Sequence, residues 1–368
     1  MRVAIAGAGV IGAAIAYELA QVPGLELSVF EAQAQPATGA TGAALGVMMG
    51  IISRKTKGRA WRLRQQAVNR YDTLIAELEA QTQRTIPYNR QGIVALRFRE
   101  NDDLDRWQAL QRQRRAQGYA LEIWDRDQLQ ARCPQINAPQ IDDPQINDPQ
   151  VCGAVYAPGD RQVDPVALTQ ALVQAAQAQG VTFNYNQAII RDAQGNITRG
   201  DRLPLAADVL ILTAGLGTPP LAPTVDLRPV LGQALQLKLP QSLGIHDFQP
   251  VITGQDVLFV PLGNGRYWLG ATVEFPDEAG VVVAQAQARA EFWQAAVQIC
   301  PAIATAMIER EWSGLRPRPW GQGAPVITEL EGSDRPTLVA AGHYRNGVLL
   351  ALGTAQAAKE WLLTLVSS

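Results

Sequence analysis

The sequence predicts a two-domain α/β protein in which a parallel sheet is assembled from separate stretches of the chain and a second domain surrounds an antiparallel sheet. Three observations support this fold class. A glycine-rich turn joins a short apolar strand to a helix near the N-terminus. A second apolar strand lies at residues 207–215, after a long stretch of other structure. Strands of alternating polarity begin near residue 227. With 368 residues, 47% of them hydrophobic and 18% charged, the chain is long enough for two cores.

The N-terminal stretch RVAIAGAGVIGAAIAYELA (residues 2–20) carries a G-x-G-x-x-G fingerprint between a strand and a helix, as in Rossmann-like dinucleotide-binding domains. We expect Gly7 to form the tight turn, Gly9 to let the backbone approach a pyrophosphate, and Gly12 to allow close helix packing. The pyrophosphate would lie at the helix N-terminus, where free N–H groups favour negative charge. A second strand ends at Glu31, where a carboxylate can accept hydrogen bonds from ribose hydroxyls.

The loop after Glu31 bears on which dinucleotide is expected. Residues 34–50 read AQPATGATGAALGVMMG, a run of small residues without strand periodicity, whereas a nicotinamide enzyme usually continues with regular βαβ units. Small residues let the backbone approach a ligand closely. We therefore interpret the loop as a further cofactor contact and expect FAD, with a flexible surface loop and an NAD-linked enzyme as the alternatives.

The middle of the chain contains two predicted helices, at about residues 56–83 and 101–117, whose charged runs are interpreted as solvated faces. Residues 134–153 then read PQINA PQIDD PQIND PQVCG, and the proline at every fifth position excludes a helix and a central strand. We expect an extended surface insertion here. A partner-binding arm is the alternative, because extended proline-rich repeats can serve as recognition segments.

Regular structure resumes at residues 160–180, where Asp164 is a plausible helix N-cap and Pro165 occupies the first helical position. A strand is expected at residues 181–190, followed by a hairpin signal at AQGN. The apolar stretch ADVLILTAGLG then suits a buried parallel strand whose end faces the ligand. The stretch LGNGRY, among the alternating strands that follow, predicts another hairpin.

Composition excludes several classes of function. A formal net charge of −2 provides no basic surface for nucleic acid or an anionic membrane. Three cysteines with two histidines cannot build the usual zinc sites, and the odd cysteine count argues against a disulfide framework and favours a reducing compartment. The sequence shows no separate leader and no apolar stretch of about 20 residues, so we expect a cytoplasmic protein without a transmembrane segment.

The chain resembles the FAD-dependent D-amino-acid oxidase family and is most similar within it to bacterial glycine oxidases. The most specific of the matching motifs are SGLRPRP and GHYRNGVLLA near the C-terminus. The stretches that carry the resemblance are IAGAGVIG (5–12), TGAALGVM (41–48), QVDPVAL (162–168), TAGL (213–216), VLGQALQL (230–237), SGLRPRP (313–319) and GHYRNGVLLA (342–351).

The resemblance implies an FAD-binding domain formed by residues 1–55, 151–225 and 326–368, and a substrate domain formed by residues 56–150 and 226–325. We expect the FAD to be bound noncovalently, because the fingerprint, Glu31 and the loop at 41–47 provide its contacts and no cysteine lies in a matching attachment motif. Together with the fingerprint, the resemblance assigns cofactor contacts to Gly7, Gly9, Val10, Ile11, Gly12, Glu31, Ala32, Ala40, Thr41, Leu45, Gly46, Val47, Ala188, Thr213, Ala214, Gly215, His343, Asn346, Gly347, Val348 and Leu349.

Two arginines carry the implied substrate chemistry. Arg316 would clamp the substrate carboxylate, a bidentate task that suits the planar guanidinium, and Arg345 would lie near the same end of the site. A helix beginning near Gly347 would stabilise the anion that gathers on reduced flavin. The alternatives are that Arg316 and Arg318 are exposed or paired surface residues and that His343 has a structural role.

The implied reaction is oxidation of a small amino acid or secondary amine. Hydride would pass from Cα to flavin N5, giving an imine and, with oxygen, hydrogen peroxide. The sequence departs from the family after GLRP, in its ALGTA ending, and at Asp256 and Leu258, where relatives tend to place His and Tyr. A dehydrogenase using another electron acceptor, or an FAD-binding scaffold or subunit without oxidase activity, are therefore the alternatives.

Overall fold

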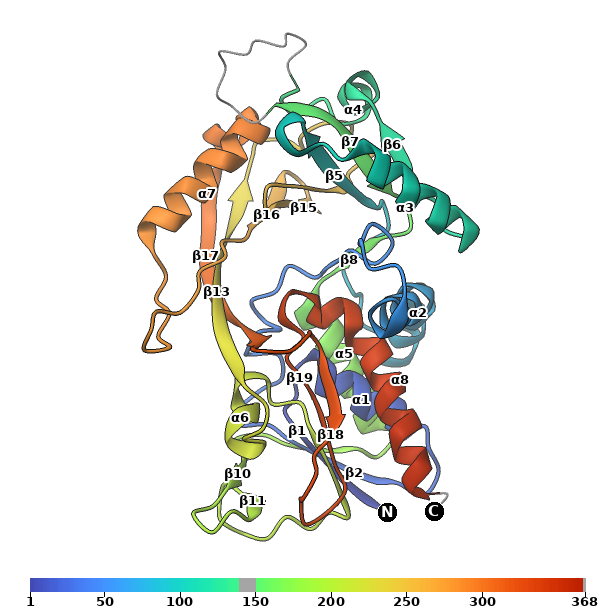
Figure 1. Cartoon of the computed structure of the whole chain (residues 1–368), viewed down its shortest axis with the longest axis vertical. Coiled ribbons are helices and arrows are strands. Elements are labelled where there is room, and N and C mark those ends of the chain that lie inside the picture. The colour runs from blue at the N-terminus through green and yellow to red at the C-terminus, as the bar shows by residue number, and fades with distance from the viewer. Residues whose placement is uncertain (139–149, 367–368) are drawn as a thin grey trace.

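The computed structural model describes residues 1–138 and 150–366. Most of the proline–glutamine repeat, expected as a surface insertion at 134–153, lies outside the described residues. The remaining chain forms two main sheets, one in each half of the molecule, and the long strands β13 (Leu227–Lys238) and β17 (Met307–Pro319) run between the halves (Figure 1). The two-sheet α/β architecture expected from the sequence is confirmed.

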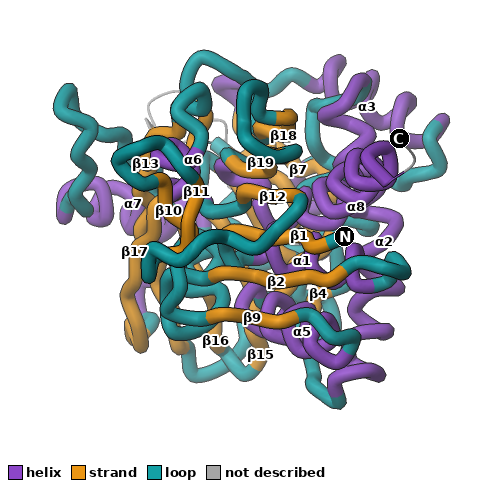
Figure 2. Tube along the Cα trace, turned by 90° about the horizontal axis from the view of Figure 1, so that it is seen from below, coloured by secondary structure: helices purple, strands orange, loops and turns teal. Residues whose placement is uncertain are grey.

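The first sheet has six strands in the order β18-β19-β12-β1-β2-β9, which lie side by side in Figure 2. All neighbours run parallel except β18 and β19. Every residue of β12 and β19 is buried, as expected where both faces of a parallel sheet are covered. The strands are β1 (Arg2–Ala6), β2 (Glu26–Phe30), β9 (Thr182–Asn184), β12 (Val209–Leu212), β18 (Val326–Glu329) and β19 (Thr337–Ala341).

Four helices pack together over one face of this sheet, namely α1 (Val10–Ala20), α2 (Gly58–Thr82), α5 (Pro165–Ala178) and α8 (Gly347–Val366). The predicted start of α5 is confirmed. The Asp164 carboxylate accepts hydrogen bonds from the backbone N–H groups of Val166 and Ala167, and Pro165 lies in the first turn, where its missing N–H costs nothing.

Helix α2 does not follow the expected domain boundary at residue 55. Its apolar stripe, which includes Ala67, Tyr71, Leu74 and Leu78, packs into the core of the first sheet against α5 and α8. The Tyr71 hydroxyl also donates a hydrogen bond to the backbone oxygen of Val348 in α8. The spacing of a helical stripe shows that one face is buried but does not say against which partner. The helix expected in the substrate domain thus packs against the helices of the first sheet.

The second sheet has eight strands in the order β17-β13-β16-β15-β14-β5-β7-β6. Its neighbours are antiparallel except β14 and β5. Strand β7 belongs here rather than with the FAD-binding segments, because it pairs with β5 and β6. The remaining strands are β5 (Ile93–Phe98), β6 (Glu122–Trp124), β7 (Val151–Ala157), β14 (Val251–Gly254), β15 (Val257–Gly263) and β16 (Arg266–Gly270).

Smaller elements complete the described chain. The predicted hairpin at LGNGRY joins β15 to β16 through Gly263, Asn264 and Gly265, all with positive φ, and the AQGN hairpin joins β10 to β11. The strand expected at 181–190 is divided between β9 and β10. The other elements are β3 (Val47–Met48), β4 (Tyr88–Asn89), β8 (Arg161–Val163), β10 (Ile189–Arg191), β11 (Ile197–Arg199), α3 (Leu104–Ala116), α4 (Arg126–Arg132), α6 (Thr218–Leu221) and α7 (Ala286–Ile299).

Within residues 1–138 and 150–366, no helix has both the length and the apolar character needed to cross a bilayer. The same part of the chain contains no group of three or more His, Cys, Asp or Glu side chains arranged to hold a metal ion.

A buried pair of opposite charges fixes the segment between the two sheets. The Asp160 carboxylate accepts hydrogen bonds from the backbone N–H groups of Gly50, Ile51 and Ile52 at 2.8, 2.7 and 3.0 Å. The Arg114 guanidinium donates to the carbonyls of Ile51, Ser53 and Lys55 and stacks over Trp61 at 3.7 Å. Two buried side chains therefore satisfy the N–H donors and the C=O acceptors of this backbone segment.

Burial raises the pKa of Asp160 to about 6, against the lowering effect of its three amide donors and Arg114. The folded protein thus binds a proton on this group more readily than the unfolded chain between about pH 4 and pH 6. Protonation of Asp160 therefore contributes its whole stabilising free energy below about pH 4, and this contribution is lost as the pH rises through about 6. Relative to Asp160→Asn, we expect the free energy of unfolding of the wild type to fall by roughly 2 to 3 kcal/mol between pH 4 and pH 7.

Urea unfolding of both proteins across this pH range measures the difference. Asp208 provides the matched control, because its ion pair with Arg2 lowers the pKa of Asp208. Asp208→Asn should therefore give a difference that changes in the opposite direction with pH. A wild-type and Asp160→Asn difference that is independent of pH would contradict the assignment.

Candidate cofactor and substrate site

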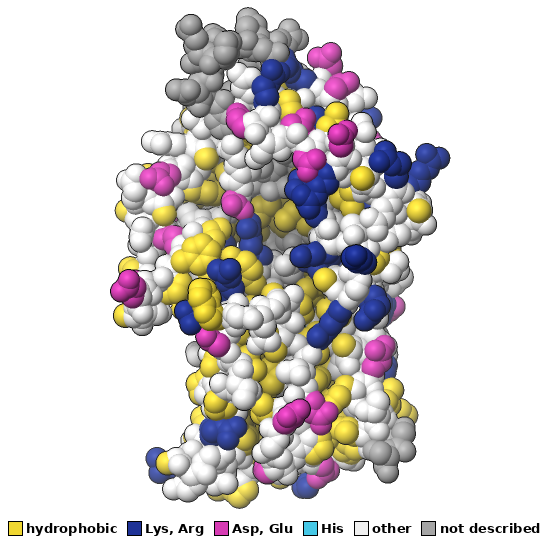
Figure 3. Space-filling view, viewed as in Figure 1, with side chains coloured by type: hydrophobic (Ala, Val, Ile, Leu, Met, Phe, Trp, Pro, Cys, Tyr) yellow, Lys and Arg dark blue, Asp and Glu magenta, His cyan; other side chains and the backbone are white. Residues whose placement is uncertain are grey.

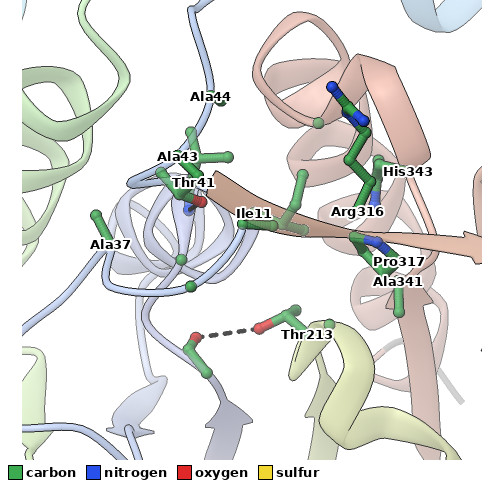
Figure 4. Close-up of a pocket in the computed structure, with 18 of the residues that line it drawn as sticks. Ile11, Ala37, Thr41, Ala43, Ala44, Thr213, Arg316, Pro317, Ala341 and His343 are labelled. Carbon is green, nitrogen blue, oxygen red and sulfur yellow. Dashed lines mark hydrogen bonds between the residues drawn. The ribbon is translucent and has the colours of Figure 1, made fainter. Parts of the chain in front are cut away.

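A cavity of about 660 Å³ lies where the carboxyl ends of the parallel strands meet and extends toward β13 and β17. Residues at or just beyond the ends of β1, β2, β12 and β19 line it, which is the edge where open α/β sheets bind ligands. Figure 4 shows Arg316 and His343 on one side of the cavity and Ala37, Thr41 and Ala43 on the opposite side. The volume falls within the range of small-molecule and cofactor sites.

The turn between β1 and α1 is packed so closely that two of its glycines cannot be replaced without movement. Gly7 has a φ of +103°, and a Cβ there would lie 2.9 Å from the backbone oxygen of Thr213. A Cβ on Gly12 would overlap the backbone oxygen of Gly7. The Thr213 hydroxyl donates to the backbone oxygen of Ala6 at 2.7 Å and locks the end of β12 to the turn. The turn therefore directs the N-terminus of α1 into the cavity.

The N-terminus of α1 is arranged for a negatively charged ligand. Gly9, Val10 and Ile11 line the cavity, and the first turn of the helix carries no acidic side chain and no side-chain cap. The Thr41 hydroxyl accepts a hydrogen bond from the Val10 N–H at 3.1 Å, so the following loop is tied to this helix end. Free N–H groups and the helix dipole favour a phosphate at this position.

Glu31 lies at the end of β2 and also lines the cavity. Its carboxylate accepts from the backbone N–H groups of Ala8 and Gln33 at 2.8 and 2.9 Å. These two bonds hold the side chain across the glycine turn, and a carboxylate oxygen keeps further acceptor capacity for a ribose hydroxyl.

The small-residue loop forms the opposite wall and is anchored along its length. Trp312 donates to the backbone oxygen of Ala43 at 3.1 Å, and Gln162 donates to that of Leu45 at 3.0 Å. Asp160 then holds the amides from Gly50 onward. Because these bonds come from both halves of the molecule, the alternative of a flexible surface loop does not describe this segment.

The start of α8 closes the cavity on the side of β19. His343 is buried and its Nε2 lies 2.9 Å from the Thr354 hydroxyl, while burial and the neighbouring Arg59 lower the pKa of His343 to about 3. The imidazole is therefore neutral at physiological pH. The first turn of α8 has no acidic side chain, so the helix dipole at Gly347 acts on the cavity without opposition.

Arg316 extends from β17 into the far end of the cavity. Its Nη1 donates to the backbone oxygens of Leu231 and Thr272, both at 3.0 Å, and the guanidinium occupies the space above Gly232 where a Cβ would stand. Within the described residues, Nη2 and Nε have no hydrogen-bond partner. Burial and the nearby Arg345 lower the pKa of Arg316. The guanidinium thus keeps one edge available for an anion.

Arg345 also lines the cavity, and its Nη2 lies 2.8 Å from an oxygen of Asp256 in the tight turn between β14 and β15. Asp256 therefore pairs with Arg345 and is not among the residues that line the cavity. Leu258 does line the cavity, close to the same end.

The structure brings nearly all sequence-predicted site residues to this cavity. The exceptions are Gly12, which serves helix packing, and Leu349, which is 1% exposed and points into the core beneath α8. The lining residues that the sequence analysis did not assign include Gly232 and Gly314, which face each other across β13 and β17. Glycines inside otherwise regular strands are a signal of close approach that could have indicated them.

A family model described as FAD dependent oxidoreductase (DAO) matches residues 2–361. Glycine oxidase of Geobacillus kaustophilus is 29% identical over 95% of this chain and 89% of the relative, and that of Bacillus licheniformis is 26% identical over 98% and 92%. The structure of glycine oxidase from Bacillus cereus has a TM-score of 0.81 at 23% identity, covering 99% of this chain and 95% of that one.

These residues fit FAD, because the glycine turn, the acid-free helix end and Glu31 supply the contacts that an adenine dinucleotide needs. Replacing Glu31 with alanine should weaken FAD binding by tenfold or more, since charge-assisted hydrogen bonds contribute about 1.5 to 3 kcal/mol each. Fluorescence titration of the apoprotein with FAD measures the dissociation constant.

The matched control is Glu26→Ala, which removes a carboxylate from the exposed start of the same strand. This variant should bind FAD as the wild type does. An unchanged dissociation constant for Glu31→Ala would remove the carboxylate from the site.

Proposed function

The chain belongs to the FAD-dependent oxidoreductase (DAO) family, and we propose from this premise that it oxidises a small amino acid or secondary amine in the manner of a glycine oxidase. The observation that carries the proposal is the half-buried Arg316, whose guanidinium has a free edge inside the cavity. The curated relatives named glycine oxidase, which match nearly the whole chain, support the same substrate class.

The cofactor would be held by elements from three parts of the chain. The N-terminus of α1 would hold the pyrophosphate, Glu31 the ribose, and the start of α8 the end of the flavin that gains negative charge. When bound, FAD supplies the acceptor for a hydride from the substrate Cα and passes the electrons to oxygen or another acceptor. The neutral His343 adds no positive charge beside this helix end.

Arg316 would hold the substrate carboxylate by Nη2 and Nε, while the bonds from Nη1 to Leu231 and Thr272 keep the guanidinium plane fixed. A carboxylate held in this way fixes the position of Cα, which is the atom that loses hydride. Glu31 is the only carboxylate among the described lining residues, and it is held at the glycine turn. The substrate amine would therefore lose its proton to solvent.

Two expectations from the sequence stay predictions within this proposal. One is a cytoplasmic location. The other is a protein partner for the repeat at 134–153, most of which lies outside the described residues. Anaerobic reduction of the flavin by glycine, sarcosine or alanine, followed by reoxidation in air, tests the enzymatic proposal itself and separates an oxidase from a dehydrogenase.

Arg316→Lys provides the sharpest test of the clamp. Lysine keeps the charge but loses the planar fork, so carboxylate ligands should bind about 30-fold to 1000-fold more weakly, equivalent to about 2 to 4 kcal/mol. Titration with simple amino and aromatic carboxylates, followed through the flavin absorption band, gives the dissociation constants.

Arg310→Lys is the matched control, because Arg310 lies on the same strand, is exposed and stacks on Trp312. It should leave carboxylate binding unchanged. Equal binding by wild type and Arg316→Lys would show that the clamp assignment is wrong.

A further inference from the structure

A second arginine follows Arg316 on the same face of β17. Side chains two positions apart on a strand point to the same side, and their Cα atoms are about 6 to 7 Å apart. Arg318 therefore follows Arg316 on one face of the strand, in the direction of Pro319. Arg228 of β13 is the cross-strand partner of Arg318, just as Val230 is that of Arg316. Arg316 lines the cavity, and Arg318 and Arg228 lie on the same face of the two strands, one step outward along β17.

Aromatic rings hold Arg318 in place without neutralising it. Its guanidinium lies 5.1 Å from the ring centre of Phe275, 5.7 Å from that of Tyr344 and 6.0 Å from that of Trp320. Tyr344 also lines the cavity, so the aromatic group continues the cavity wall outward. Figure 3 shows hydrophobic and basic side chains side by side at mid-height on this face of the molecule.

The charge of Arg318 is uncompensated within the described part of the chain. No carboxylate there lies within ion-pair distance of it, whereas Arg228 pairs with Asp226 at 3.2 Å and Arg345 pairs with Asp256 at 2.8 Å. Like charges directly opposite each other on neighbouring strands are destabilising. Arg228 and Arg318 form such a pair, and Arg316 adds a further positive charge one step inward. An anion bound at this end of the cavity would relieve that repulsion.

We propose that Arg318 binds a second carboxylate of the substrate, so that the preferred substrate is a dicarboxylic amino acid or amine. This inference rests on the proposed function, in which Arg316 holds the first carboxylate. Arg316 and Arg318 present two guanidinium groups from one face of β17, an arrangement that suits a molecule with two carboxylates. A guanidinium stacked on aromatic rings keeps its in-plane N–H groups free for such an anion.

The binding test uses the FAD-loaded protein and isothermal titration calorimetry with glutarate and valerate, which differ in the second carboxylate. Wild type should bind glutarate about tenfold or more tightly than valerate, because a charged hydrogen bond is lost in the second case. Arg318→Gln should bind glutarate about tenfold more weakly and valerate unchanged. Arg318→Lys should retain part of the preference, and Arg310→Gln, on the same strand but far from the cavity, should retain all of it.

The substrate test measures anaerobic flavin reduction by both enantiomers of aspartate and glutamate, with asparagine and glutamine as uncharged matches. The acids should be favoured in kcat/KM, and Arg318→Gln should lower kcat/KM for the acids alone. An unaltered flavin spectrum and unfolding temperature would show that the variants are folded.

The possible results separate this inference from the proposed function. If glycine or alanine reduces the flavin while the acids have no advantage, or if Arg318→Gln leaves their advantage unchanged, the second carboxylate site is overturned and the amino-acid oxidation stands. If no amino acid reduces the flavin but glutarate still binds in an Arg318-dependent manner, the oxidation is overturned and the second site stands. Equal binding of glutarate and valerate by wild type overturns the inference in either case.

Discussion

The close approach of the β1–α1 turn to the end of β12 is the constraint on which the site depends. Gly7 and Gly12 leave no room for a side chain, and the Thr213 hydroxyl joins the two segments. This contact fixes the direction of α1 relative to the sheet, and hence the position of its N-terminal N–H groups. The loop that carries Thr41 is then placed by its bond to Val10. The cavity is thus a consequence of backbone packing more than of any single polar group.

The small-residue loop is hydrogen-bonded to both halves of the molecule. Val10 of α1 and Gln162 of β8 hold it from one side, while Trp312 of β17 holds it from the other. Strand β17 also carries Arg316, so the proposed clamp and the cofactor wall share one support. A displacement of β17 would therefore change both the cavity wall and the position of the guanidinium.

Much of the first sheet could be predicted because its signals are local. The fingerprint glycines, the Asp164 cap and the apolar strand ending at Thr213 each depend on neighbouring residues. The placement of α2 and β7 could not, since periodicity records burial but not the partner. The Arg345–Asp256 pair depends on a turn and a helix end more than 80 residues apart in sequence, roughly the length of a small domain. Leu349 was expected at the cofactor but lies in the core, because neighbouring residues of a helix face different sides.

The order of strands in the first sheet has a consequence for how the protein is made. Its central strand β1 pairs with β2 and β12, and β12 in turn pairs with β19, which follows only after the whole stretch from β13 to β18. Such long-range pairing slows folding and leaves the edge of β12 exposed until β19 has been made and has paired with it. Helix α8, which closes the cavity, follows β19 directly. The nascent chain can thus complete its binding pocket only after β19 and the start of α8 have been translated, long after the glycine turn that begins the pocket.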